Sequence, residues 1–457
     1  MEKSTEKKYL KWYNKVGYGA GSGGMQFTYG LLNTFVLFYM TNVAGLEAGI
    51  LGTLMMLARV MDGFSDVIFG NLIDHTHSRW GKARPWMFWS YVGNAVCLVA
   101  LFGVPESLGE SAKYVYFFIT YVLLNVIFYT INNISYAALT SLCTRNRHER
   151  VQMGSYRFMF ATAGSLLTSY LTIDVVERLG GGAIGWRNTA ILYGILGFIV
   201  NTISVLSIKE LPEEETETTS KNPADSSVSL WQALKILIRN KYYLIILLLN
   251  FLTNLSAGLM GINIYFMTYV LGDANLLGTF SMASMIPMIL GLAVTPSIVK
   301  KVKSIYKTSI YGYIIALAGR ILVLVGGYMR NVPMMLVFLF IAGLGSSGIT
   351  CNLNALIAET SDYLYRTTGK RMDGAMFSCS SVGIKVGSGI GTALCGWLLS
   401  AGGFVQNAAV QPDSCINMIM FLFLWVPVIS FALILILLPM LTVEKANAKL
   451  QAAEQTA

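Results

Sequence analysis

The 457-residue sequence is 54% hydrophobic but only 12% charged, and it carries a formal net charge of +9. The charged fraction is about half that of an ordinary soluble protein, and the apolar runs repeatedly approach the ~20 residues that span a bilayer, which excludes a water-soluble fold. The basic excess lies in short clusters between apolar runs, without the aromatic interleaving of a nucleic-acid-binding face, so it reports membrane topology.

The start of the chain, MEKSTEKKYLKWYNK, is charged and leads directly into a glycine-rich span. It shows neither the short apolar core nor the small-residue cleavage site of a secretory leader, so we expect a mature, cytoplasmic N-terminus. The six cysteines show no CxxC spacing and mostly fall inside apolar runs. We expect them to be reduced and to behave as small hydrophobic residues.

Apolar runs between polar breaks predict twelve transmembrane helices, and the predicted fold class is therefore an all-α membrane protein. The predicted spans are 14–40, 46–74, 85–104, 113–143, 150–176, 187–208, 242–270, 276–299, 306–328, 333–360, 372–401 and 415–441. Under this threading, only four basic residues lie on the external side, namely Lys113, Arg178, Arg187 and Arg330. By the positive-inside rule, both termini are predicted to be cytoplasmic.

The segment KELPEEETETTSKNPADSSVSLWQ, between the sixth and seventh spans, is acidic and rich in Ser, Thr and Pro. Such composition has little apolar surface to bury, so it predicts a linker. The predicted organisation is an N-terminal six-helix half at 1–208, a cytoplasmic linker at 209–241, and a C-terminal half with a short cytoplasmic tail at 242–457. This is the architecture of major-facilitator transporters, whose halves rock about a site near the middle of the bilayer.

Ionisable residues inside predicted spans are costly, at about 2.5–3.5 kcal/mol each, and usually face a cavity or a partner. Asp62 and Asp66 are four residues apart, so their carboxylates lie on one helix face, one turn apart. Two such charges favour a cation or a proton between them, and Ser65 and Thr130 could complete a sodium shell. The structural alternative is an ion pair between Asp62 and Arg59.

Two cations come from different halves of the chain, Arg157 in the fifth span and Lys385 in the eleventh. Together they could hold the hydroxyls or the acidic group of a ligand, or be tied to the two aspartates. The alternative for Lys385 is that it snorkels or only balances charge. Arg320 is left without a predicted role.

The loop between the second and third spans has the spacing of a facilitator-superfamily gate, with a glycine near the helix end, an acid one turn later and a tight basic turn. Its residues are Gly70, Asp74, Arg79, Gly81, Lys82 and Arg84. Asp74 could cap or pair with a neighbouring helix end and latch one state of the transporter. The three histidines lie in cytoplasmic loops, where we expect them to be solvated rather than to bind a metal.

Several runs match one family in the expected order across nearly the whole chain. ARVMDGFSDVIFGNLIDHTHSRWGKARPW resembles the first signature of the glycoside-pentoside-hexuronide:cation symporters, the family of the melibiose permease. SDYLYRTTGKRMDGAMFS followed by IKVG resembles the second signature, and it adds Asp362 and Arg371 to the predicted gate. YTINNISYAAL and YRFMF resemble elements of the fourth and fifth spans.

The resemblance implies cation-site carboxylates at Asp62 and Asp66, a hydroxyl ligand at Thr130, a sugar-contacting arginine at Arg157 and a pocket lysine at Lys385. Three departures concern the sugar and the ion. Gln26 and Asn133 stand where the melibiose permease has acidic sugar ligands, which puts melibiose in doubt. Ser65 replaces an asparagine, which leaves sodium and proton coupling both open.

The sequence therefore predicts a secondary transporter of the bacterial inner membrane that couples entry of a sugar or glycoside to Na+ or H+. The substrate-binding set is Gln26, Asn133, Arg157, Ser381 and Lys385. The loss of both acids gives a slight preference for a hexuronide over a neutral pentoside or hexoside. A lysolipid symporter and a non-transporting sugar sensor are the alternatives. We expect a monomer in the bilayer without a cofactor, a nucleic-acid partner or an enzymatic activity.

Overall fold

The computed structural model describes residues 8–144, 146–211, 230–302, 304–368 and 373–456. Every regular element within these ranges is helical, which confirms the predicted all-α fold class. The chain divides into two compact units. Unit 1 comprises Met1–Lys221 and Gly396–Pro412, and unit 2 comprises Asn222–Cys395 and Asp413–Ala457.

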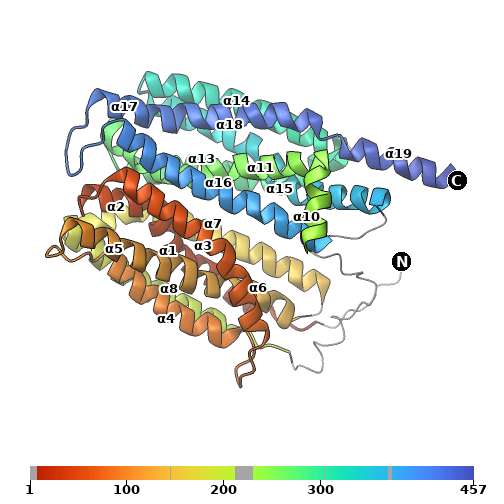
Figure 1. Cartoon of the computed structure of the whole chain (residues 1–457), viewed down its shortest axis with the longest axis horizontal. Coiled ribbons are helices and arrows are strands. Elements are labelled where there is room, and N and C mark those ends of the chain that lie inside the picture. Colours follow the sequence, from red (N-terminus) through yellow and green to blue (C-terminus); the bar gives the residue numbers. More distant parts are fainter. Residues whose placement is uncertain (1–7, 145, 212–229, 303, 369–372, 457) are drawn as a thin grey trace. The chain divides into compact units, whose positions relative to one another are not determined.

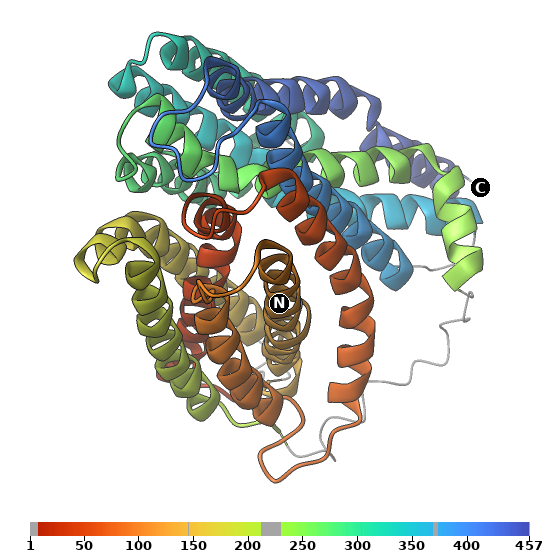
Figure 2. The ribbon, with the colours of Figure 1, turned by 60° about the vertical axis from the view of Figure 1, so that its left-hand side comes forward.

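The first six predicted spans correspond to continuous helical stretches of unit 1 (Figure 1). Its elements are α1 (Trp12–Gly30), η1 (Leu31–Phe35), α2 (Val36–Asn42), α3 (Ala48–Asp74), α4 (Arg84–Leu101), α5 (Glu110–Tyr121), η2 (Val122–Tyr129), α6 (Thr130–Leu142), α7 (Arg147–Arg178) and α8 (Gly182–Ser207). Figure 2 shows α3 running the length of the unit before the loop that leads into α4. The π-helical turns η1 and η2 interrupt the first and fourth spans.

The last six predicted spans correspond to helical stretches that lie mainly in unit 2. They are formed by α11 (Lys241–Gly258), η4 (Leu259–Gly261), α12 (Ile262–Tyr265), η5 (Phe266–Val270), α13 (Leu276–Val302), α14 (Ile305–Tyr328), α15 (Val332–Thr368), α16 (Asp373–Ala401), α17 (Asp413–Met420), η6 (Phe421–Trp425), α18 (Val426–Leu437) and η7 (Leu438–Met440). Two shorter helices flank them. The first, α10 (Leu230–Arg239), lies within the predicted linker, and α19 (Val443–Thr456) forms the tail.

Eight of the described helical stretches are long and apolar enough to cross a bilayer, and the first part of α15, Val332–Gly348, is apolar over a shorter length. The spans that fall below this strict criterion include those with the charged or glycine-rich faces, such as α1 and α3. Polar atoms on those faces need an internal partner or a water-filled cavity. Residues of a transport site are therefore expected on α1 and α3.

Close helix packing in unit 1 depends on glycine. Along α1, a Cβ added at Gly21 would lie 2.6 Å from the side chain of Ser204 on α8. A Cβ added at Gly164 of α7 would lie 2.6 Å from the carbonyl oxygen of Gly23. Helices packed this closely are typical of membrane bundles, in which small residues let backbones approach. Glycine thus allows α1, α7 and α8 to pack closely, and this packing positions Gln26 of α1 and Arg157 of α7.

In unit 2, glycines likewise allow α11 and α16 to pack closely. A Cβ at Gly387 would lie 2.4 Å from the carbonyl oxygen of Phe251, and one at Gly391 would lie 2.3 Å from that of Leu255. The buried core of this unit also includes side chains from α14, α15 and α18, among them Tyr313, Leu356 and Ile434. This packing fixes the position of Lys385 on α16 within unit 2.

Candidate transport site

The central contact of unit 1 joins α3 to α6. The hydroxyl of Thr130 donates a hydrogen bond of 2.7 Å to Oδ1 of Asp62. Thr130 is buried, and its Oγ1 also lies 3.1 Å from the carbonyl oxygen of Asn125 on the preceding π-helical turn. A π turn displaces the register of a helix and is frequent at functional sites. Here η2 ends directly before the hydroxyl that meets the aspartate.

The other two predicted cation ligands lie on the same helix. Ser65 is buried, and its hydroxyl donates to the backbone carbonyl of Asp62 at 2.9 Å. Because that proton is engaged by the helix, the Ser65 oxygen could serve a cation only through its lone pairs. Asp66 lies one turn beyond Asp62 and is partly buried. The donor set is carboxylate and hydroxyl oxygen, the chemistry that hard cations prefer.

Arg59, one turn before Asp62 on α3, contacts the first span at η1 through an amide. Its Nη2 donates to Oδ1 of Asn33 at 2.6 Å, while its buried Nε has no hydrogen-bond partner in the described part of the chain. Asn33 lies on the π-helical turn η1. Asn33 was not predicted as a site residue, because an asparagine in an apolar span gives little signal beside ionisable residues. A nearby stack of Tyr29 on Tyr129, with ring centroids 5.0 Å apart, was missed for the same reason.

Arg157 of α7 lies against α6. Its Nη2 donates to Oδ1 of Asn133 at 2.8 Å, and its guanidinium carbon lies 4.9 Å from the centroid of the Tyr136 ring. Tyr136 in turn stacks on Tyr18 of α1, with ring centroids 4.4 Å apart. The structure thus brings together two predicted sugar-site residues, Arg157 and Asn133, and adds an aromatic face beneath the cation.

Gln26 of α1 packs against α7 two turns beyond Arg157. A Cβ added at Gly164 would lie 3.0 Å from its Cβ, and its backbone carbonyl accepts a hydrogen bond of 3.3 Å from Thr168. Among the described residues, nothing forms a hydrogen bond with the side-chain amide of Gln26. That amide is therefore available to both donate to and accept from a ligand hydroxyl.

The two candidate residues of unit 2 lie one turn apart on α16, with Lys385 partly buried and Ser381 exposed. Arg320 belongs to a different part of the unit. Its guanidinium carbon lies 5.5 Å from the centroid of the Phe431 ring. Its buried Nε makes no hydrogen bond to any described residue. The side chain of Arg320, which belongs to α14, therefore packs against α18. Among the described residues, it forms no hydrogen bond with Ser381 or Lys385 that would include it in the predicted site.

The predicted gate is built around Glu210, a residue that the sequence pattern did not single out. Its carboxylate accepts hydrogen bonds from the backbone N–H groups of Lys82, Ala83 and Arg84, at 2.7, 3.0 and 2.9 Å respectively. Gly81 has φ of +108°, and a Cβ there would lie 2.3 Å from that carboxylate. Negative charge at the start of a helix is favourable, and glycine is the residue that permits this approach.

The remaining gate residues take less specific positions. Gly70 has no atom within 4 Å of an added Cβ, and both Arg79 and Asp362 are exposed. Asp74 is the last residue of α3, but its side chain and all of Arg371 lie outside the described residues. The latch predicted for Asp74 stays a prediction.

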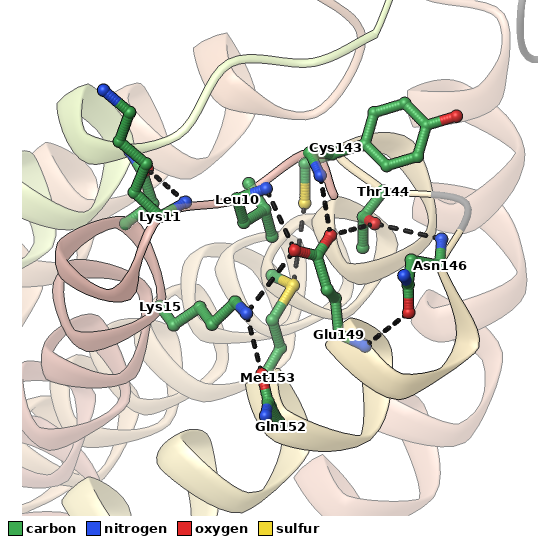
Figure 3. A network of polar contacts seen from close by, with 11 residues as sticks. Leu10, Lys11, Lys15, Cys143, Thr144, Asn146, Glu149, Gln152 and Met153 are labelled. Atoms are coloured by element: carbon green, nitrogen blue, oxygen red, sulfur yellow. Dashed lines mark hydrogen bonds and ion pairs between the residues drawn. The ribbon is translucent and has the colours of Figure 1, made fainter. Parts of the chain in front are cut away.

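A second carboxylate, Glu149, ties the N-terminal segment to the start of α7 (Figure 3). It is only 2% exposed and accepts hydrogen bonds of 3.1 Å from the backbone N–H groups of Tyr9 and Leu10 and one of 2.7 Å from the Thr144 hydroxyl. Lys15 completes the cluster, with Nζ 3.4 Å from Oε1. Burial by itself would raise the pKa of Glu149, but these hydrogen bonds and Lys15 outweigh it and lower the pKa.

The comparisons with known proteins agree with this fold. Residues 17–445 match the family described as MFS/sugar transport protein. The isoprimeverose transporter of Lactiplantibacillus pentosus is 31% identical over 98% of this chain and 92% of its own length. The putative glycoside/cation symporter YagG of Escherichia coli is 28% identical over 93% and 90%, and the glucuronide carrier protein homolog of the same organism is 27% identical over 88% and 87%.

Solved structures support the fold alone, because their sequence identity is low. A bacterial homologue of the lysosomal transporter Spinster matches with a TM-score of 0.65 at 12% identity, covering 96% of this chain and 98% of that one. The nucleoside transporter NupG matches with a TM-score of 0.59 at 13% identity, covering 92% and 98%. The chain therefore belongs to the MFS/sugar transport protein family of membrane transporters, within its glycoside-pentoside-hexuronide:cation symporter-like group.

Proposed function

We propose that this protein imports a sugar or glycoside together with a cation, Na+ or H+. The observation that carries the proposal is the hydrogen bond of 2.7 Å between Thr130 and Asp62 inside unit 1. A carboxylate that is partly buried in a transmembrane bundle is costly, and it is tolerated where an ion or a proton is bound and released. A coupling ion held at Asp62 and Asp66 is the simplest use of this arrangement.

The sugar-binding role falls to the neighbouring contact between α6 and α7, since Asn133 lies one turn beyond Thr130 on α6. Arg157 is oriented by Asn133 and the Tyr136 ring, and the Gln26 amide makes no hydrogen bond to a described residue. Sugar hydroxyls need paired donors and acceptors, which an arginine and two amides supply. We propose that Ser381 and Lys385 of unit 2 complete the binding set.

The coupling is tested with Asp62→Asn in proteoliposomes that contain an ion gradient. The variant should lose accumulation of the transported sugar against its gradient while it keeps facilitated exchange, because the sugar-binding residues remain. A variant that still accumulates sugar would remove Asp62 from the coupling site. Ligand binding by the wild-type protein with no exchange or uptake would indicate a sensor instead, and uptake of lysolipid without sugar would indicate the lysolipid alternative.

The finer proposal concerns the cargo, for which we favour an acidic glycoside such as a hexuronide. The candidate binding set has two cationic side chains, Arg157 and Lys385, and its other members, Gln26, Asn133 and Ser381, are uncharged. A binding set with cations and no carboxylate suits an anionic ligand. Relatives named for isoprimeverose and for glucuronide are 31% and 27% identical to the chain, so the names alone do not choose between cargoes.

A matched pair of ligands, a glucuronide and the corresponding glucoside, tests this preference. If the carboxylate pairs with Lys385 or Arg157, the bond contributes about 1.5–3 kcal/mol, which is roughly 10- to 100-fold in affinity. Lys385→Gln should then weaken the glucuronide by that factor and the glucoside much less. If substitutions at Lys385 and at Arg157 each lower the affinity for the glucuronide and the glucoside equally, a neutral pentoside or hexoside is favoured. The assay is run at saturating cation so that changes at the cation site cancel.

We also propose that both termini and the segment 209–241 face the cytoplasm, because the basic residues gather there. Single cysteines at 213–225, which lie outside the described residues, test this orientation. They should react with a membrane-impermeant thiol reagent only in inside-out vesicles. Labelling in intact cells would reverse the threading.

A further inference from the structure

An apolar groove runs along the surface of unit 1 between α4 and α8, away from the polar contacts described above. Its volume is about 420 Å³. Its walls are formed by Val92, Val96 and Val99 of α4 and by Ile191, Ile195 and Phe198 of α8. Several of these side chains are exposed, including Val96 at 65% and Ile195 at 54%. All of them lie within transmembrane helices, so the groove faces the lipid phase rather than water.

The groove exists because small residues form its floor. A Cβ added at Gly194 would lie 3.4 Å from the Cβ of Ala95, so the two helices approach closely there. The larger side chains on either side then stand above the floor. From Val92 to Val99 the groove extends about 10 Å along the helix axis, since each residue rises 1.5 Å. This is about two thirds of the ~15 Å hydrocarbon depth of one leaflet.

A cation lies at one end of this groove. Arg187 precedes Ile191 by four residues on α8, and Gly194 and Phe198 continue the same face at helical spacing. The aliphatic part of Arg187 rests against the end of α4, because a Cβ added at Gly103 would lie 3.4 Å from its Cδ. Arg187 is exposed, and among the described residues it forms no ion pair within 4 Å.

Glu106 lies at the same end of the unit, since Tyr39 is close to both it and Arg187. Glu106 is exposed to solvent and forms no ion pair with Arg187 within 4 Å. The end of a transmembrane helix is the level at which arginine meets lipid headgroups, and its charge-assisted hydrogen bonds to phosphate are frequently bidentate. An apolar groove of leaflet depth that ends at an unpaired arginine has the two chemical features of a phospholipid.

We propose that this surface is a binding site for an anionic phospholipid. One acyl chain occupies the groove between α4 and α8, and the headgroup phosphate contacts the guanidinium of Arg187. The site lies in the leaflet at the Arg187 end of the bundle, which is the outer leaflet under the predicted topology. The proposal does not depend on the sugar or on the coupling ion.

Native mass spectrometry of the purified full-length protein tests the headgroup contact. The probes are phosphatidylglycerol and phosphatidylcholine with identical acyl chains. The wild type should retain phosphatidylglycerol preferentially, and Arg187→Gln should reduce that preference about fivefold, since one basic residue contributes about that much near a charged lipid surface. Arg178→Gln removes the same charge from the same end of the bundle, where α7 ends, and should leave the preference unchanged.

A groove-filling variant tests the acyl chain separately. Gly194→Leu should lower retention of both lipids, whereas Ile199→Phe, which adds volume at an exposed position of α8 outside the groove, should not. The proposal is overturned if Arg187→Gln leaves the preference intact, if Arg178→Gln reduces it equally, or if Gly194→Leu retains both lipids as the wild type does. Crosslinking between two copies through a cysteine at position 96 in bilayers would assign the groove to a protein interface instead.

Discussion

The carboxylate of Glu210 accepts a hydrogen bond of 2.9 Å from the backbone N–H of Arg84, the first residue of α4. An equivalent contact occurs in unit 2, where the Glu444 carboxylate accepts 2.7 Å from the Ser304 hydroxyl and 3.2 Å from the Tyr306 N–H at the start of α14. In each half of the chain, a glutamate that follows the sixth span of that half accepts hydrogen bonds at the start of its third span. The repeat relationship between the halves of a facilitator accounts for this correspondence.

The first prediction concerns this cap. Glu210→Ala leaves three N–H groups at the start of α4 without their acceptor, and we expect a stability loss of about 1–3 kcal/mol. The melting temperature in detergent should fall, and cysteines placed in 78–80 should become more reactive. Glu210→Gln, which keeps an acceptor but not the charge, should give an intermediate loss. An unchanged melting temperature in both variants would show that the contact contributes nothing to stability. Glu106→Ala, at an exposed loop position, is the control.

The second prediction concerns pH and Glu149. Its pKa is lowered in the folded protein, so its contribution to stability is complete above its ordinary value of about 4.5 and is lost as the pH falls through the folded value. The melting temperature of Glu149→Gln should therefore be below that of the wild type at pH 7. The difference should disappear at a pH below the folded value, because the protonated carboxyl then resembles the amide.

The comparison is made at each pH between the two proteins, so that effects of acid on other groups cancel. A difference that grows as the pH falls from 7 would contradict the role of the ionised carboxylate. Glu149→Gln should also increase hydrogen exchange at Tyr9 and Leu10, whose N–H groups donate to the carboxylate.

The third prediction compares two glycines within helices. A Cβ at Gly391 would lie 2.3 Å from the Leu255 carbonyl oxygen, so Gly391→Ala must separate α16 from α11, and we expect a cost of about 1–3 kcal/mol. Gly154 of α7 has no atom within 4 Å of an added Cβ, so Gly154→Ala should be neutral or stabilise by up to about 1 kcal/mol. The melting temperature should therefore fall for Gly391→Ala and stay the same or rise for Gly154→Ala. Equal shifts would contradict the packing argument.

Much of the fold could be predicted from the sequence because hydrophobic runs of membrane length are a strong signal. The twelve predicted spans and the helical stretches differ by only a few residues at most of their ends. The main exception is α15, which continues to Thr368 through residues that were assigned to the following loop. A helix can continue into water without changing its hydrogen bonds, so hydropathy locates the membrane boundary and not the helix end.

The site could be predicted in part. Asp62 and Arg157 were singled out because charges in apolar spans are conspicuous, and Thr130 was named as a hydroxyl neighbour of the aspartates, a role that the family resemblance also implies. Glu210 and Glu149 could not be found in this way, since their partners are backbone N–H groups far away in the chain. Backbone groups carry no sequence signature, and an acidic residue near a span end looks the same whether it is solvated or caps a helix.

The last prediction tests the contact between α3 and α6 and also identifies the ion. Thr130→Val keeps the shape of the side chain but removes the donor to Asp62, whereas Thr130→Ser keeps the hydroxyl. A hydrogen bond to a charged group contributes about 1.5–3 kcal/mol, so the cation concentration for half-maximal uptake should change by roughly 10- to 100-fold in Thr130→Val and little in Thr130→Ser.

Thr120→Val is the matched control, because the Thr120 hydroxyl is hydrogen bonded only to backbone carbonyl groups of its own helix, those of Tyr116 and Phe117. Uptake is measured once against Na+ at fixed pH and once against pH without Na+. If the Na+ dependence of uptake shifts in Thr130→Val and not in Thr120→Val, the ion bound near Asp62 is Na+. If the pH dependence shifts in this way, the ion is H+. If neither dependence shifts while maximal uptake falls, Thr130 supports the helix packing and the coupling ion binds elsewhere.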